Sequence, residues 1–286
     1  MLRRSASRGR SVGTENHFRY TNNSKQSSVS MLSATMSDFT YVKHAHEEYS
    51  IGLTLQGRQD FFCRNAFYKS KPGNVMLFNP EDIHDGHSGV EQNLEYVMLY
   101  IHPEALHPMF QALGHRKNTT LRLNNTLFND PMLRHQVYGI SQQLMENKYS
   151  KIEHEAGLFL LAQSLVRLHG SLERPSHRSR ADRLLLRAKD YILANLADDI
   201  SIDDIANVAN MSKFHFIRAF REHFCITPHQ YVLNCRINYA RRELLAGRNA
   251  TNAAFASGFT DASHLNRNFK RVFGMTPKQF QLQWTR

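Results

Sequence analysis

The sequence contains little cysteine and no long apolar run. Its 286 residues include three cysteines, Cys63, Cys225 and Cys235, which are too scattered for a disulfide framework or a CxxC zinc site. No apolar stretch approaches the roughly 18 residues that a membrane-spanning helix needs. These absences argue against a disulfide-stabilised secreted protein and a helical membrane protein. They predict about two domains, at roughly 100–200 residues each, in a reducing compartment.

Positive charge is unevenly distributed along the chain. The net charge is +11, but residues 31–177 carry 13 Lys and Arg against 15 Asp and Glu. Residues 178–286 carry 17 against nine, which gives this last third a net charge of +8. A basic domain beside a nearly neutral one is typical of proteins that bind nucleic acid. Solvated surface charge without a partner is the alternative that composition leaves open.

The first thirty residues predict a disordered basic tail. Residues 1–30 are rich in Arg, Ser and Asn, and they contain too few apolar residues to bury a core. They also lack the apolar centre of a secretory signal. An organellar transit peptide has a similar composition and is the alternative for this segment.

The spacing of apolar residues divides the rest of the chain. Over 31–130, short runs such as YSIGLTLQG and LEYVMLYI, bounded by Gly, Pro and Asn, predict the strands of a small barrel or sandwich. Over 131–170, apolar residues recur every three or four positions and predict helices. Residues 171–182 are rich in Ser, Arg and Pro and predict a linker, and 183–286 are helical in pattern throughout.

The last segment contains one pattern twice. FREHFCITPHQYV begins at Phe220, and FKRVFGMTPKQFQ begins 49 residues later at Phe269. Each copy predicts a short helix, a turn and a longer helix, which together form a helix-turn-helix, and each Thr-Pro pair predicts the capped start of another helix. The helix predicted over 228–246 is roughly 28 Å long, so it can hold two recognition helices about one DNA turn, 34 Å, apart.

At these residues the chain resembles the AraC-type transcriptional regulators. The resemblance rests on IAxxxNMSxxHFxRxF and GFTDASHLNRNFKRVFGMTP and covers about 183–286. Two positions depart from the family pattern, because Cys225 stands where Gly usually ends the helix and Ala254 where Ile is usual. A left-handed turn at Cys225 would cost about 1 kcal/mol, and Ala254 predicts a looser core in the second unit.

The resemblance implies which side chains face DNA. The expected base contacts are Phe214, Ile217, Arg218, Ala262, Ser263, Asn266 and Arg267. Their chemistry agrees, since arginine can bind guanine through two hydrogen bonds, asparagine can read adenine, and apolar side chains can contact thymine methyl groups. Contacts to phosphate, which position the protein without reading sequence, are expected from Lys213, Arg221, His264, Lys270 and Arg271. For any single arginine, a solvated helix face is the alternative.

The stretch over 44–89 resembles the cupin-like sensor barrel of the same regulators. HxH, YxIGLTLxG and PGxxxLFNPxxxH carry this looser match, which covers about 36–105. It implies a small polar effector in the barrel, bound by His46, Glu48, Tyr49, Thr54 and His84. It also implies a homodimer formed through the helices of 131–170, along the stripe Leu158, Leu161, Leu165 and Leu168. Packing of this stripe on its own barrel is the alternative.

Three histidines support a rival hypothesis. His44 and His46 lie on one face of a strand, because side chains alternate along strands, and His84 can reach them from a neighbouring strand. Three imidazoles and the carboxylate of Glu48 resemble the metal ligands of many cupin enzymes. The rival is therefore a metal-responsive regulator or a metal-dependent cupin enzyme, although an enzyme would leave the basic repeat unexplained.

The sequence thus predicts a two-domain α+β protein. A cupin-like jelly-roll barrel with a helical hairpin precedes an all-α double helix-turn-helix domain. We expect a cytoplasmic bacterial regulator, nucleoid-associated when bound, that binds double-stranded DNA and activates transcription through RNA polymerase. No catalytic constellation is recognised, and no cofactor and no membrane partner are expected.

Overall fold

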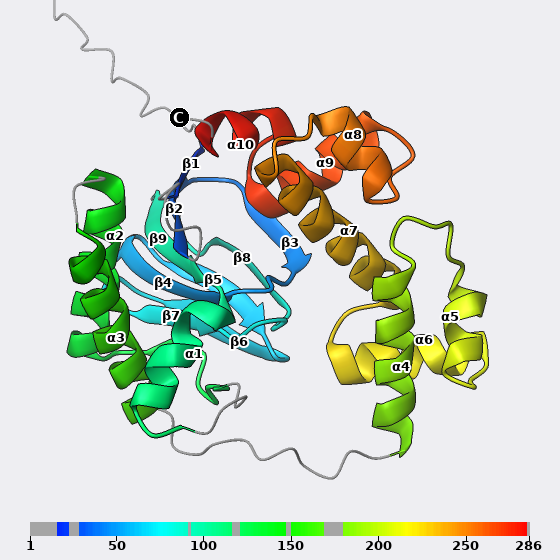
Figure 1. Ribbon diagram of the computed structural model, residues 1–286, viewed down its shortest axis with the longest axis horizontal. Coiled ribbons are helices and arrows are strands. Elements are labelled where there is room, and N and C mark those ends of the chain that lie inside the picture. The colour runs from blue at the N-terminus through cyan, green and yellow to red at the C-terminus, as the bar shows by residue number, and fades with distance from the viewer. Residues whose placement is uncertain are drawn as a thin grey trace, which may run out of the picture.

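The computed structural model describes residues 16–22, 29–90, 93–115, 121–146, 150–168 and 180–284. In this part of the chain a β-rich domain is followed by a helical domain (Figure 1). The helices α8 to α10 lie beside the barrel, α4 to α6 lie farther from it, and α7 connects the two groups. The predicted two-domain α+β architecture is confirmed.

Two antiparallel sheets enclose the interior of the first domain. The larger sheet has the strand order β1 (His17–Asn22), β2 (Val29–Met36), β9 (Leu94–Ile101), β4 (Tyr49–Gln56), β7 (Val75–Phe78) and β10 (Leu127–Phe128). The smaller sheet has the order β3 (Thr40–His44), β8 (His84–Ser88), β5 (Gln59–Cys63) and β6 (Ala66–Ser70). The apolar runs of the sequence form β4, β7 and β9 at the centre of the larger sheet. They are continuously apolar because one face meets the barrel interior and the other meets helices.

The predicted disorder of 1–30 is wrong at its C-terminal end. Residues 17–22 form β1, which pairs with β2 from His17 opposite Thr35 to Asn22 opposite Ser30. Tyr20 on this strand is only 5% exposed. Composition concealed the strand because its two inward aromatic side chains are surrounded by polar residues. Residues 1–15 and 23–28 lie outside the described part of the chain.

Three helices cover the outer face of the larger sheet: α1 (Pro103–Ala112), α2 (Pro131–Glu146) and α3 (Lys151–Leu168). The leucine stripe assigned to dimerisation packs into this layer. Leu158, Leu161 and Leu165 are at most 3% exposed, and Leu168 is partly buried against the same core. The stripe therefore stabilises its own barrel, and the expectation that it forms a dimer interface is wrong. Helical periodicity identifies an apolar face without identifying what covers it.

The second domain consists of two helix-turn-helix units joined by a long helix. Its helices are α4 (Arg180–Ala194), α5 (Ile202–Val208), α6 (Lys213–Phe224), α7 (Pro228–Leu245), α8 (Ala250–Ala256), α9 (Ala262–Phe273) and α10 (Pro277–Trp284). Since α4 begins at Arg180, the last residues of the predicted linker over 171–182 are helical, and 171–179 lie outside the described residues.

The repeated Thr-Pro pairs begin α7 and α10, as the sequence predicts. Thr227 caps α7 reciprocally with Gln230, because the Gln230 N–H donates to the threonine hydroxyl and the Gln230 side chain accepts from the Thr227 N–H. Thr276 and Gln279 make the same pair of bonds at α10. The repeated motif Thr-Pro-x-Gln is therefore a capping box with proline at the first helical position.

The two units differ in what they pack against. The first has its own core, formed by α4 to α7, in which Phe216 and Phe220 are fully buried. The core of the second unit is continuous with the barrel interior: the ring of Tyr20 lies 5.1 Å from that of Phe280 and 6.2 Å from that of Phe273. The second helix-turn-helix unit is therefore docked on the first domain.

Substitutions at the two helix ends test the left-handed turns. Cys225 has φ of +61° and Gly274, its counterpart, has φ of +75°. Cys225→Gly should raise the free energy of unfolding by about 1 kcal/mol, because glycine adopts this conformation without strain. Gly274→Ala should destabilise the full chain, since a Cβ would lie 2.6 Å from the ring of Phe18. Urea unfolding of both variants measures this, and a Cys225→Gly variant less stable than the wild type would contradict it.

Candidate DNA-binding surface and sensor interior

The first recognition helix, α6, turns its predicted DNA-contacting residues to solvent. Phe214 is 78% exposed, Arg218 is exposed and Ile217 is half-buried. Phe216 and Phe220 hold the opposite face in the core. The exposed ring of Phe214 and the exposed guanidinium of Arg218 therefore both lie on the part of α6 that the core does not cover.

The second recognition helix, α9, presents the equivalent face. Ser263, Asn266 and Arg267 are exposed and Ala262 is half-buried, while the core holds Leu265 and Phe269. The helix is started by Asp261, whose carboxylate accepts the N–H of His264 at 2.7 Å. His264 is half-buried with its ring 5.2 Å from that of Phe259, so it is less available than the exposed basic residues.

The predicted phosphate contacts lie beside these faces. Arg221, Lys270 and Arg271 are exposed. Lys213 pairs with Asp203 at 2.7 Å, an interaction that sequence reasoning missed because the partner lies ten residues away on α5. Within the described residues, no ion pair neutralises Arg218, Arg221, Arg267, Lys270 or Arg271. Uncompensated positive charge on both units suits contact with a phosphate backbone.

The sensor borders the second recognition helix. A hollow of about 570 Å³ beside α9 is lined by Phe39, His264, Arg267, Asn268, Lys270 and Arg271. Phe39 precedes β3 and is the sensor residue in this wall. A shift of β3 relative to α9 would therefore alter the surface that the predicted base contacts present.

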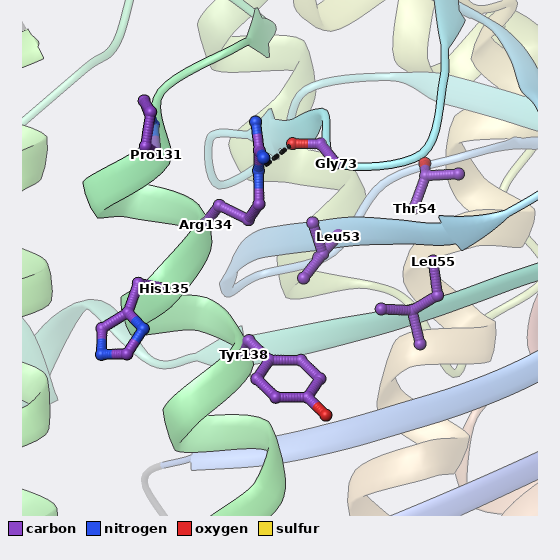
Figure 2. Close-up of a pocket in the computed structure, with 8 residues that line it drawn as sticks. All are labelled: Leu53, Thr54, Leu55, Gly73, Pro131, Arg134, His135 and Tyr138. Atoms are coloured by element: carbon purple, nitrogen blue, oxygen red, sulfur yellow. Dashed lines mark hydrogen bonds between the residues drawn. The ribbon is translucent and has the colours of Figure 1, made fainter.

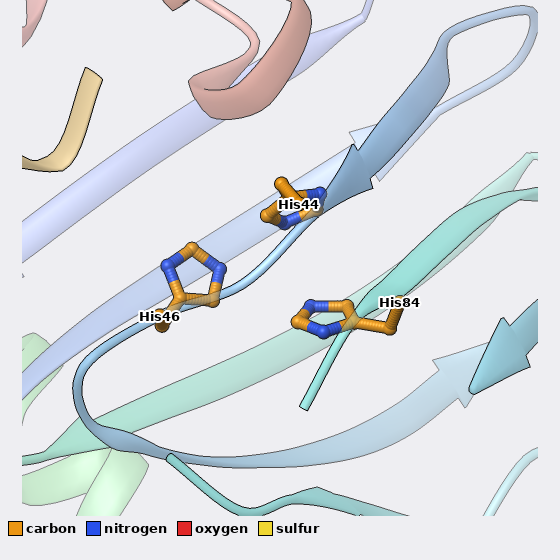
Figure 3. Close-up of side chains that lie close together, drawn as sticks. All are labelled: His44, His46 and His84. Atoms are coloured by element: carbon orange, nitrogen blue, oxygen red, sulfur yellow. The ribbon is translucent and has the colours of Figure 1, made fainter. Parts of the chain in front are cut away.

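Three buried histidines meet in the barrel interior (Figure 3). One nitrogen from each of His44, His46 and His84 lies within 4.8 Å of the others, and no side chain of the three is more than 6% exposed. Nδ1 of His44 donates to the Val42 carbonyl at 2.7 Å, and Nδ1 of His84 to the Asp82 carbonyl at 2.8 Å. These bonds leave each Nε2 with a free lone pair, while Nδ1 of His46 has no partner among the described residues.

The three imidazoles are neutral at pH 7. Burial lowers the pKa of His44 from the usual 6.5 to about 4. Burial, and in second place the neighbouring His44, lowers the pKa of His46 and of His84. Neutral imidazoles with Nδ1 held by a carbonyl are the form in which histidine binds a metal ion.

The space between these histidines is too small for a metabolite. The cavity measures about 20 Å³, enough for one water molecule or one ion. Aromatic side chains fill the rest of the interior: Tyr41, Phe78, Tyr96 and Tyr100 line the cavity itself. The strand pattern of the sequence predicted the barrel. It could not predict the empty volume inside, because that volume depends on how bulky side chains pack together.

The five residues predicted to bind an effector do not form one pocket. The structure brings His46 and His84 together, but Glu48 pairs with Arg241 of α7 at 2.7 Å. The Tyr49 hydroxyl donates to the Leu121 carbonyl at 2.5 Å. Glu48 directly precedes β4 and Tyr49 begins it, so these neighbouring side chains point to opposite sides and meet different partners.

Thr54 lies at a different hollow. Its hydroxyl is bonded to that of Ser70 at 2.7 Å, and it borders a space of about 410 Å³ between β4 and α2 (Figure 2). Leu53 and Leu55 form one side of this space and Tyr138 lies opposite, while Arg134 donates to the Gly73 carbonyl at 2.7 Å. No motif in the sequence marked this hollow.

Comparisons with known proteins identify the two domains. Residues 27–188 match the AraC-like ligand binding domain, and residues 205–283 match a helix-turn-helix domain. The chain belongs to the AraC family of transcriptional regulators. An AraC-family chain is a regulator of transcription and not an enzyme. Within the described residues, none of the helices has the length and apolar character that crossing a bilayer demands.

Two relatives of this AraC-family chain are similar to it over most of their own length. YbfI of Bacillus subtilis, an uncharacterised HTH-type transcriptional regulator, is 28% identical over 229 residues, covering 79% of this chain and 81% of its own. LumQ of Photobacterium leiognathi, a probable transcriptional regulator, is 25% identical over 245 residues, covering 83% and 91%. The crystal structure of ToxT from Vibrio cholerae has the same fold, with a TM-score of 0.59 at 14% identity over 91% of this chain and 99% of that one.

Proposed function

We propose that this AraC-family regulator reads two successive major grooves of DNA with α6 and α9, under the control of a small molecule. The observation that carries the proposal is the matching exposure of the two arginines, Arg218 and Arg267, on equivalent faces of a duplicated unit. The connecting helix α7 has 18 residues and is about 27 Å long, close to one turn of B-DNA.

The proposed readout follows from the side chains on these faces. Arg218 and Arg267 each bind a guanine through O6 and N7, and Asn266 binds an adenine. Phe214 and Ile217 contact thymine methyl groups, which removes an exposed aromatic ring from water. Basic side chains at the ends of both helices hold phosphates.

Control by an effector is proposed from the sensor's position. ToxT has been crystallised with an unsaturated fatty acid bound, so a protein of this fold carries a small molecule. In this chain the sensor touches the DNA-reading surface through Phe39 and shares a core with the second unit. An effector that prefers one arrangement of the two domains would shift the population toward it. Activation through RNA polymerase is the proposed outcome, in the cytoplasm at the nucleoid.

Alanine substitutions distinguish base contacts from phosphate contacts. Arg218→Ala and Arg267→Ala should each cost about 1–3 kcal/mol on a cognate site selected from random DNA, and little on unselected DNA. Lys270→Ala is the matched control, because loss of a phosphate contact should weaken both equally and flatten the salt dependence. Gel-shift titrations at several salt concentrations measure this. Equal losses on both DNAs for Arg267→Ala would show that it touches only the backbone.

Homodimerisation is proposed through the outward face of α3, in place of the buried leucines. Ile152 is 75% exposed, Leu160 49% and Phe159 37%, and their spacing places them on one side of the helix. Apolar side chains grouped on an exposed helix face are typical of an interface.

Charged substitutions on this face test the dimer. Phe159→Glu together with Leu160→Glu should weaken the dimer at least about tenfold, since each would place a carboxylate in an apolar contact. Leu193→Glu, at a leucine 45% exposed on α4, is the control and should leave assembly unchanged. Sedimentation velocity measures the oligomeric state. A double variant that dimerises like the wild type would move the interface elsewhere.

A metal-responsive regulator is the second candidate, favoured by the histidine cluster. Neutral His44, His46 and His84 offer three nitrogens around a space that fits one ion. His44 and His46 flank Ala45, whose N–H and carbonyl are bonded to Asn234 of α7 at 3.2 and 3.3 Å. A shift of the histidines on metal binding would reach the DNA-binding domain through these bonds.

Metal content of the purified chain tests this candidate. This second candidate predicts about one equivalent of Zn²⁺ or another divalent transition metal, with an increase in melting temperature on loading. His46→Ala should abolish both effects, and His135→Ala, a histidine outside the cluster, should preserve them. Elemental analysis and thermal unfolding with and without a chelator provide the measurements. Absence of bound metal at saturating Zn²⁺ would eliminate the candidate and leave DNA binding unaffected.

A further inference from the structure

The connecting helix α7 belongs to the cores of both helix-turn-helix units. In its N-terminal half, Tyr231 and Val232 pack in the core of the first unit. In its C-terminal half, Ile237 and Leu244 pack in the core that the second unit shares with the barrel. Each unit is therefore held on its own half of the helix. Because helices curve, this arrangement alone leaves the angle between the two units adjustable.

Arg236, in the middle of α7, binds the loop that follows α4. Its Nε donates to the Leu196 carbonyl at 3.0 Å, and its Nη2 donates to the Asp198 carbonyl at 2.7 Å. A guanidinium group donates in a fixed planar geometry, so two bonds to one loop determine both the distance of that loop from α7 and its orientation. Arg236 is half-buried in this position and attaches the first unit to the middle of the connecting helix.

The turn of the second unit lies on the same loop. Gly258, between α8 and α9, has φ of +78°. A Cβ at this position would overlap the carbonyl oxygen of Leu196 and would lie 2.9 Å from Nε of Arg236. A loop of the first unit, a side chain of α7 and the turn of the second unit thus meet at one point. We call Leu196, Arg236 and Gly258 the inter-unit contact.

The equivalent turn of the first unit shows that backbone conformation alone does not require glycine here. Asn210, which follows α5, has φ of +56° and is exposed. In both turns the N–H of the next residue donates to the carbonyl five residues before it, at 3.1 Å after Asn210 and at 3.0 Å after Gly258. Asparagine is one of the few residues that adopt a left-handed conformation readily. The neighbouring Leu196 carbonyl is therefore what excludes a side chain at Gly258.

We propose that the inter-unit contact determines the spacing at which this chain reads two major grooves. The recognition helix α9 begins at Ala262, four residues after Gly258, while Leu196 packs in the same core that holds α6. The contact therefore fixes α6 relative to α9. One added base pair moves the second groove by about 3.4 Å and turns it by about 34°, and a fixed pair of helices does not follow. Arg236 and Gly258 are thus positioning residues, a role that rests on the proposed binding of two grooves.

Gel shifts with the full chain on DNA sites of different spacing test the proposal. The probes are a selected cognate site and its versions with one base pair added or removed between the two groove elements. The wild type should bind the altered sites at least about tenfold more weakly, because one recognition helix loses its base contacts. In Arg236→Ala this difference should fall below about threefold. Its binding to the unaltered site should weaken about 3- to 10-fold, since the two units become ordered only on DNA.

A second variant and two controls connect this effect to the inter-unit contact. Gly258→Asn places the residue of the first turn against the Leu196 carbonyl and should lose the spacing preference as Arg236→Ala does. Asn210→Gly, at the exposed turn, should keep the preference. Arg242→Ala removes another arginine of α7, which pairs with Glu47 of the first domain at 2.6 Å, and should also keep it. Circular dichroism confirms that each variant is folded.

Failure of this inference is distinguishable from failure of the proposed function. Equal weakening of Arg236→Ala at every spacing, or an unchanged spacing preference in both Arg236→Ala and Gly258→Asn, would overturn the positioning role. Loss of the preference in Arg242→Ala would show that docking on the first domain sets the spacing instead. Base substitutions in each groove element of the unaltered site report on two-groove binding independently. A wild type that needs both elements but tolerates a changed spacing would retain the proposed function and lose this inference.

Discussion

The packing of the second helix-turn-helix unit against the sensor barrel is the interaction on which the rest of this structure depends. Phe273 and Phe280 complete a core that begins with Tyr20 on β1. Gln283 of α10 accepts the N–H of Tyr20 at 2.7 Å and donates to the carbonyl of Phe18 at 3.1 Å, which covers the exposed edge of the sheet. Without these contacts β1 would have partners only on the β2 side, and the aromatic side chain of Tyr20 would lose its contacts with Phe273 and Phe280.

Polar contacts along α7 make the docking specific. Asn234 and Asn238 are bonded to the backbone of Ala45, and Arg241 pairs with Glu48 where both side chains are nearly buried. Breaking a buried ion pair leaves an uncompensated charge, so the domains separate only if water or a ligand replaces these partners. The same helix also carries the first unit, which has its own core. The barrel and both helix-turn-helix units therefore pack against one helix, α7, and the proposed coupling between them would pass through it.

Local features of this fold could be predicted from the sequence, and contacts between distant segments could not. The two helix-turn-helix units, the capping threonines at 227 and 276 and the left-handed turn at Cys225 are determined by residues a few positions apart, so they are visible in the sequence. The strand β1 was missed because its aromatic side chains stand among polar residues, and because two of the rings that bury Tyr20, Phe273 and Phe280, are more than 250 residues away. The leucines of α3 were assigned to a dimer interface, but they pack on the barrel of their own chain. The spacing of apolar residues predicts a buried helix face without indicating which surface buries it.

In the candidate sites, too, the features set by nearby residues could be predicted and those set by distant contacts could not. The solvent-facing residues of α6 and α9 follow from helical spacing and the repeat. The approach of His44, His46 and His84 was predicted, but the strand argument was wrong for His46, which lies past the end of β3; His44 and His84 are paired across β3 and β8. The sequence did not predict that side chains fill the barrel interior, or that a cavity lies between the two domains. Both features depend on the volumes of side chains from many elements.

We propose that one chain binds two successive major grooves of DNA, and footprinting tests this most directly. Hydroxyl-radical cleavage of a selected cognate DNA bound to the full chain should reveal two protected patches per half-site on one face of the duplex, centred about 10 bp apart. Base substitutions opposite Arg218 and Arg267 should each weaken binding by about 1–3 kcal/mol. A single protected patch per half-site, with one of the two arginines indifferent to DNA sequence, would contradict the account.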